Sequence, residues 1–98
     1  MNKNILKRAI EHYGTHNQML KCIEECSELS RAVSRILTEL SSGDGCTTKA
    51  SEENLHEELA DVAIMLEQMV MMFDCVDEVQ IQTIKKIKRL EERLKENK

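Results

Sequence analysis

The sequence contains no proline and no tryptophan, and only three of its 98 residues are glycine. These glycines, Gly14, Gly43 and Gly45, all precede residue 46. Tight turns between strands need glycine and proline, whereas long helices need neither. The scarcity of both residues therefore argues against a sheet-rich fold and predicts an all-α chain.

Aromatic side chains are also scarce, because Tyr13 and Phe73 are the only two. The core must then be aliphatic, with six methionines available to fill gaps in it. We expect a single domain over residues 1–98. A domain of this length buries only about 60–65% of the surface that its unfolded chain exposes, so association with further copies would supplement its core.

No apolar run reaches the roughly 20 residues that a membrane span requires. The longest apolar-rich run, residues 62–73, is interrupted by Glu67 and Gln68. The first residues, MNKNILKRAIEHYG, lack the apolar stretch of a secretory signal. The four cysteines form no CxxC pair, so we expect reduced thiols in a cytoplasmic protein without membrane attachment.

The net charge of −4 argues against a general binder of nucleic-acid polymers. Residues 77–98 nevertheless carry seven Lys and Arg against five Asp and Glu, so the acidity lies in the preceding part of the chain. An acidic body with a basic final segment could hold a cation at one place and phosphate oxygens at another.

The spacing of apolar residues predicts four helices. The first covers about residues 3–13 and ends near Gly14, a typical helix-stop residue. The second begins near Asn17, a candidate N-cap, and continues to Leu40. A Ser-, Gly- and Thr-rich loop at residues 41–48 follows it.

The third helix is expected to begin with Ser51 as its cap and to end near Phe73. Additional apolar residues at positions 63–65 widen its stripe, so we expect burial on more than one side. The fourth helix has Asp77 as a candidate cap and continues to about residue 95. Long helices with short connections predict a compact antiparallel bundle of about four helices.

Two acidic segments stand out, EECSE at residues 24–28 and EELAD at residues 57–61. Residues three or four apart on a helix lie about 5–6 Å apart on one side, which pairs Glu25 with Glu28 and Glu58 with Asp61. Two facing pairs would concentrate negative charge that a hard divalent cation can neutralise. The alternative is a solvated acidic face, but both segments flank apolar residues that should be buried.

EECSEL at residues 24–29, followed by EELADV at residues 57–62, resembles the paired ExxE and ExxD motifs of MazG-like all-α nucleoside triphosphate pyrophosphohydrolases. HYGTHNQMLKCIEECSEL and KKIKRLEERL extend the resemblance over most of the chain. It implies Mg²⁺, with Mn²⁺ as a substitute, held by Glu25, Glu28, Glu58 and Asp61. It also implies hydrolysis of a (deoxy)nucleoside triphosphate to the monophosphate and pyrophosphate, by attack of water on the α-phosphorus.

The resemblance also suggests roles for further residues. The candidates to orient the water or take its proton are Glu24, Glu25 and Glu57. The residues expected on the phosphates are Lys21, Lys86 and Arg89, of which the last two match the family's K-x-x-R element, with Lys85 and Arg93 as second choices.

The nucleobase is expected near the start of the second helix. Gln18 and Asn17 offer both hydrogen-bond donors and acceptors, and Tyr13 or His12 could stack on a base. Alternatively, Asn17 is a cap and Tyr13 a packing residue. His56 lies out of phase with the second acidic motif, and we expect it to face away.

Two rival functions are retained. Phosphoribosyl-ATP pyrophosphohydrolase would use similar carboxylates to cleave the same kind of bond. A non-catalytic helical interaction module would instead use Ile84, Ile87, Leu90 and Leu94, which resemble a short coiled-coil seam. The same row favours packing between subunits, so we expect a homo-oligomer, either a dimer or a tetramer.

Overall fold

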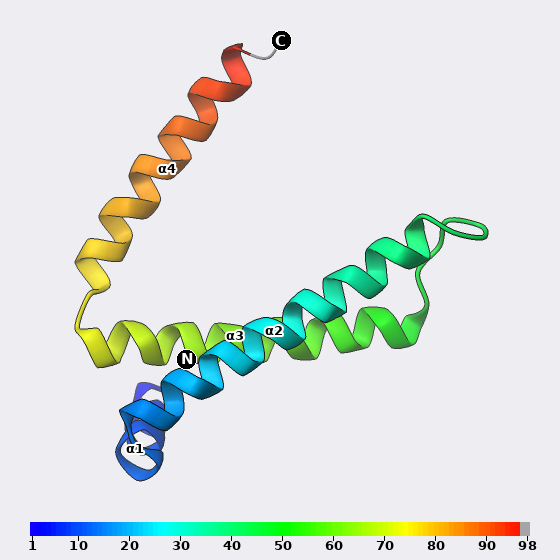
Figure 1. The fold of residues 1–98 in the computed structure, drawn as a ribbon. Coiled ribbons are helices and arrows are strands. Elements are labelled where there is room, and N and C mark those ends of the chain that lie inside the picture. Colours follow the sequence, from blue (N-terminus) through cyan, green and yellow to red (C-terminus); the bar gives the residue numbers. More distant parts are fainter. Residues whose placement is uncertain (97–98) are drawn as a thin grey trace.

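The computed structural model describes residues 1–96, and over this range it contains four helices and no strand (Figure 1). They are α1 (Lys3–Tyr13), α2 (Thr15–Leu40), α3 (Lys49–Phe73) and α4 (Val76–Glu96). The predicted all-α helical bundle is confirmed. The long helices α2 and α3 run antiparallel as a hairpin, and α1 packs against both at one end.

The junction of α1 and α2 follows from Gly14. This residue has φ of 90° and its N–H donates to the Ile10 carbonyl at 2.9 Å, which ends α1 where the sequence predicts. The prediction that Asn17 caps α2 is wrong, because α2 begins directly after Gly14. Asn17 Nδ2 instead donates to the Tyr13 carbonyl at 2.9 Å, satisfying an acceptor at the end of α1.

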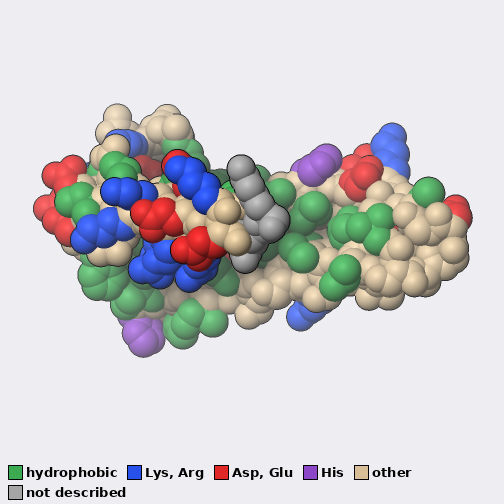
Figure 2. All heavy atoms as spheres, turned by 90° about the horizontal axis from the view of Figure 1, so that it is seen from above, with side chains coloured by type: hydrophobic (Ala, Val, Ile, Leu, Met, Phe, Trp, Pro, Cys, Tyr) green, Lys and Arg blue, Asp and Glu red, His purple; other side chains and the backbone are tan. Residues whose placement is uncertain are grey.

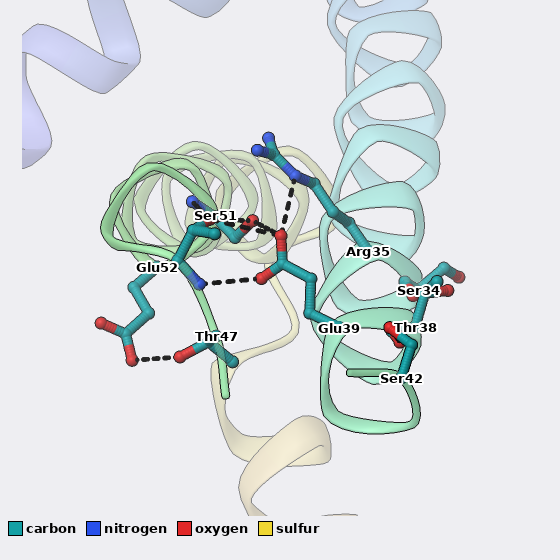
Figure 3. A network of polar contacts seen from close by, with 9 residues as sticks. Ser34, Arg35, Thr38, Glu39, Ser42, Thr47, Ser51 and Glu52 are labelled. Atoms are coloured by element: carbon teal, nitrogen blue, oxygen red, sulfur yellow. Dashed lines mark hydrogen bonds and ion pairs between the residues drawn. The ribbon is translucent and has the colours of Figure 1, made fainter. Parts of the chain in front are cut away.

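The start of α3 is joined to the end of α2 by a polar network (Figure 3). Thr48, not the predicted Ser51, is the N-cap, and its hydroxyl accepts from the Ser51 N–H at 3.1 Å. Ser51 is 1% exposed, and its hydroxyl donates to Glu39 Oε2 at 2.5 Å. The Thr48 N–H donates to Glu39 Oε1 at 3.0 Å, so one carboxylate closes the hairpin across the loop.

The buried apolar core of the described residues is small. It consists of Leu6, Ala32, Val62 and Met65. The expectation that α3 is buried on more than one side is wrong for the single chain, because Leu59 and Leu66 are 49% and 53% exposed. The apolar stripe of α3 is wider than the surface that α1 and α2 cover.

The fourth helix extends away from the other three (Figure 1). Within residues 1–96 it contacts only α3, and every described residue of α4 is exposed. It begins at Val76, so Asp77 lies in its first turn and is not the cap. The radius of gyration, 17.2 Å, exceeds the roughly 13 Å of a compact 100-residue domain because of this extension.

Large apolar side chains consequently lie open to solvent. Ile84, Ile87 and Leu94 on α4 are 63%, 60% and 65% exposed. Figure 2 shows hydrophobic side chains at the surface beside the charged groups of α4 and also over the α2–α3 hairpin. None of the described helices is apolar over enough of its length to cross a membrane.

Candidate metal centre and the adjoining pocket

Three carboxylates converge where α2 faces α3. Glu25, Glu58 and Asp61 each offer an oxygen, and these three oxygens all lie within 4.8 Å of one another. Glu58 and Asp61 share one face of α3 because they are three residues apart. Glu25 comes from α2 and is only 6% exposed. The structure therefore brings together three of the four predicted metal ligands.

Glu28, the fourth predicted ligand, lies one turn further along α2 and borders the same group. Burial raises the pKa of the Glu58 carboxyl above its ordinary value. The negative charges of Glu28, then Asp61, raise this pKa further. The charge of Glu25 and a hydrogen bond with Glu28 act in the same direction. The other three carboxyl groups of the predicted ligand set thus all act electrostatically on Glu58.

Two oxygens of this group are buried without a partner. Neither Oε2 of Glu25 nor Oε2 of Glu58 has a hydrogen-bond partner among the described residues. A buried polar atom without a partner costs free energy, and a buried charge costs more. A divalent cation would neutralise the carboxylates and satisfy both oxygens, and an all-oxygen donor set suits Mg²⁺.

Lys21 lies at the edge of the carboxylate group. Its Nζ is 3.3 Å from Oε1 of Glu25, one turn away on α2. The hydrogen bond with Glu25, followed by the charge of Glu24, raises the pKa of Lys21, so its ammonium stays charged at neutral pH. The lysine pairs with one oxygen of Glu25 and leaves the buried Oε2 free for another cation.

A pocket of about 480 Å³ adjoins the carboxylates. Its charged end contains Lys21, Glu25 and Asp61. Its other lining residues come from α1, α2 and α3. Two of them are the amides Gln18 and Gln68, and the walls are formed by Ala9, Tyr13, Ile64 and Met65. This volume lies within the range of small-molecule sites, and the mixture of apolar walls with a few polar groups is typical of them.

The two amides of the pocket bond to each other. Gln18 Nε2 donates to Gln68 Oε1 at 2.7 Å, and the two residues are 8% and 3% exposed. Gln18 was predicted as a binding residue, whereas Gln68 was missed. The sequence did carry a signal for Gln68. It is a polar residue within the apolar run 62–73, and it lies seven residues after Asp61, on the same helix face.

Other predicted site residues lie apart from the carboxylate group. Glu24 and Glu57 are exposed and do not belong to it, although Glu24 acts on Lys21. His56 is exposed, and the ring of His12 packs edge-on against Tyr13 with centroids 4.7 Å apart.

The basic residues predicted on the phosphates divide into two groups. Lys21 lines the pocket, but nothing from α4 does within the described residues. The α4 residues concerned are the predicted Lys86 and Arg89 and the second choices Lys85 and Arg93.

The four cysteines are free thiols within the described part of the chain, in agreement with the predicted reduced state. Burial, followed by the nearby Cys26, raises the pKa of the Cys22 thiol. A raised pKa keeps this thiol protonated at neutral pH, which favours packing over metal binding.

In comparisons with known proteins, no family model matches this chain, and no curated protein or solved structure is significantly similar to it.

Proposed function

We propose that this chain is a divalent-cation-dependent nucleoside triphosphate pyrophosphohydrolase of the MazG-like kind, acting on nucleotides of the cytoplasm. The observation that supports it best is the pair of buried, unpartnered oxygens of Glu25 and Glu58 inside a group of facing carboxylates. The order of the two acidic motifs, ExxE before ExxD, supports the same family. Phosphoribosyl-ATP stays an alternative substrate, because its cleaved bond is of the same kind.

In this proposal Glu25, Glu28, Glu58 and Asp61 hold Mg²⁺. When bound, the ion polarises phosphoryl oxygens and lowers the pKa of a bound water. Lys21 places a positive charge at the charged end of the pocket, where an α-phosphate oxygen would need a hydrogen-bond donor.

The group that takes a proton from the attacking water must lie within hydrogen-bond reach of that water. Of the three candidates, Glu25 lines the pocket, whereas the exposed Glu24 and Glu57 do not, which favours Glu25 for this role.

We further propose a homo-oligomer, a dimer or a tetramer, in which α4 packs against another copy. A single chain leaves the row of Ile84, Ile87, Leu90 and Leu94 uncovered, and such a row needs an apolar partner. Lys86 and Arg89 do not line the pocket of their own chain. Packing of α4 on a neighbour would supply these positive charges to the neighbour's pocket.

The second candidate function is a non-catalytic helical interaction module. The exposed row on α4 favours it, since the same surface would suit a helical partner. Such a module has no use for the carboxylate group, so it should tolerate Glu58→Gln without loss of function.

Pyrophosphate release decides between these candidates. We would assay a panel of ribo- and deoxynucleoside triphosphates and phosphoribosyl-ATP, with and without Mg²⁺, for the wild type, Glu58→Gln and Glu53→Gln. Glu53 is the matched control, because it is an exposed glutamate of the same helix outside the carboxylate group. The proposal expects Mg²⁺-dependent release that Glu58→Gln abolishes and Glu53→Gln keeps. Release that survives Glu58→Gln would contradict it.

A further inference from the structure

The hydrogen-bonded amides of Gln18 and Gln68 form the uncharged end of the pocket. Two helical turns separate this end from the carboxylates on both helices, since Gln18 is seven residues before Glu25 and Gln68 is seven residues after Asp61. Seven residues of α-helix correspond to about 10.5 Å of rise. The antiparallel hairpin therefore places the amide pair opposite the charged end, at a separation comparable with the length of a nucleoside.

Both amides keep hydrogen-bonding capacity after they bond to each other. Gln18 uses one N–H and Gln68 uses its oxygen in their mutual bond. Their mutual bond is the one side-chain hydrogen bond that the described residues give to either amide, so the Gln18 oxygen and the Gln68 NH₂ remain available. Exchanging the oxygen and nitrogen of both amides would leave the same inventory, one acceptor and one NH₂ group. Both residues are more than nine-tenths buried, and both line the pocket, so their remaining groups can be reached from the pocket.

We propose that the Gln18–Gln68 pair reads the hydrogen-bonding edge of the nucleobase, and that Gln68 is a specificity-determining residue of this site. This inference rests on the proposed function. Each nucleobase carries a donor beside an acceptor on its pairing edge, which an acceptor and an NH₂ side by side can complement. Tyr13, Ile64 and Met65 supply the apolar walls against which a flat ring would lie.

Selectivity follows from the burial of the pair. A base that presents its donor and acceptor in the matching order satisfies both remaining amide groups. A base in the opposite order would leave both remaining amide groups of these largely buried residues unpaired beneath it, which is costly. Gln68 should thus affect which base is accepted more than it affects the rate of the chemical step.

The test compares Gln68→Leu, Gln68→Glu and the control Gln82→Leu, which removes an exposed glutamine of α4. kcat and KM are measured for four ribo- and four deoxynucleoside triphosphates with Mg²⁺. We expect Gln68→Leu to lower kcat/KM for the preferred base by about tenfold or more, mainly through KM, and to flatten the ranking of the bases. Gln68→Glu replaces the NH₂ donor by acceptors and should reorder the ranking. Gln82→Leu should keep it.

Mn²⁺ titration without nucleotide shows whether the variants keep the carboxylate group, which lies two turns away. If Mn²⁺ binding is kept while every nucleotide loses the same factor, the pair is only structural and the inference is overturned. If the wild type hydrolyses nothing, the proposed function fails, and binding of AMP, GMP, CMP and UMP then tests the pair separately. Selective binding that Gln68→Leu abolishes would support it, whereas equal or absent binding of all four would overturn it.

Discussion

Glu25 on α2 and Asp61 on α3 contribute oxygens to one group within 4.8 Å, together with Glu58. Glu25 is buried and Asp61 is exposed, so the group lies partly inside the hairpin and reaches solvent at Asp61. Like charges at this separation repel each other, and the low dielectric around Glu25 strengthens the repulsion. Without a cation, the arrangement therefore lowers the stability of the hairpin that carries it.

This repulsion predicts that the order of stability of the wild type and Glu58→Gln reverses when metal is added. Glu58→Gln removes one charge and keeps the side-chain volume, so its Tm without metal should be above that of the wild type. Saturating Mg²⁺ should reverse the order, because binding stabilises only the chain that retains its ligands. Mn²⁺ affinity should fall about tenfold or more in the variant.

Thermal unfolding with chelator and with Mg²⁺ measures the stabilities, and titration calorimetry measures the affinity. Glu53→Gln should behave as the wild type in all three experiments. A Glu58→Gln chain that is less stable than the wild type in chelator would show that Glu58 has a structural role instead.

The helices and the two acidic pairs could be predicted from sequence because both depend on local periodicity. The caps could not be predicted as reliably. Thr48 and Ser51 are both good cap residues, and the choice between them depends on Glu39, which reaches them from another helix. Gln68 was missed for a similar reason, since its role depends on a partner fifty residues away. The direction of α4 depends on the turn at Asp74, which has φ of 48°.

The Glu39 network predicts a stability that depends on pH. Hydrogen bonds from Ser51 and Thr48 lower the pKa of the Glu39 carboxyl below its ordinary value of 4.5. The folded chain thus binds this proton less tightly than the unfolded chain. The stabilising contribution is fully present above the unfolded pKa and is lost as pH falls through the folded pKa.

The free-energy difference between wild type and Glu39→Gln should therefore be largest at neutral pH and shrink below about pH 4.5. Urea unfolding at pH 7, 4 and 3 measures it, with Glu53→Gln as the control for an exposed glutamate. Thr48→Ala, which removes the N-cap, should cost about 1 kcal/mol at pH 7. A difference for Glu39→Gln that stays constant through the acid range would contradict the network's role.

The apolar row of α4 predicts self-association. Ile87→Asp places a charge among side chains that the proposed oligomer buries, so it should shift the chain to monomers. Gln82→Asp introduces the same charge on another face of the helix and should leave assembly intact. Sedimentation velocity over a range of concentrations distinguishes these states. A wild type that is monomeric at high micromolar concentration would rule out the oligomer.

Mixing inactive variants tests whether α4 completes the site of a neighbour. Glu58→Gln lacks a proposed metal ligand, and Lys86→Gln lacks a basic group that does not line its own pocket. Unfolding and refolding the two together should form mixed dimers with one intact site, restoring about a quarter of the wild-type activity for random pairing. If mixtures that have demonstrably exchanged subunits recover no activity, Lys86 acts in the site of its own chain or in no site.

The most direct test of the central claim is hydrolysis of the preferred nucleoside triphosphate in ¹⁸O-labelled water with Mg²⁺, followed by mass spectrometry of the products. Attack at the α-phosphorus predicts one labelled oxygen in the nucleoside monophosphate and none in the pyrophosphate. Label in pyrophosphate or inorganic phosphate would contradict this route, and the absence of hydrolysis for every nucleotide of the panel would contradict the proposed enzyme.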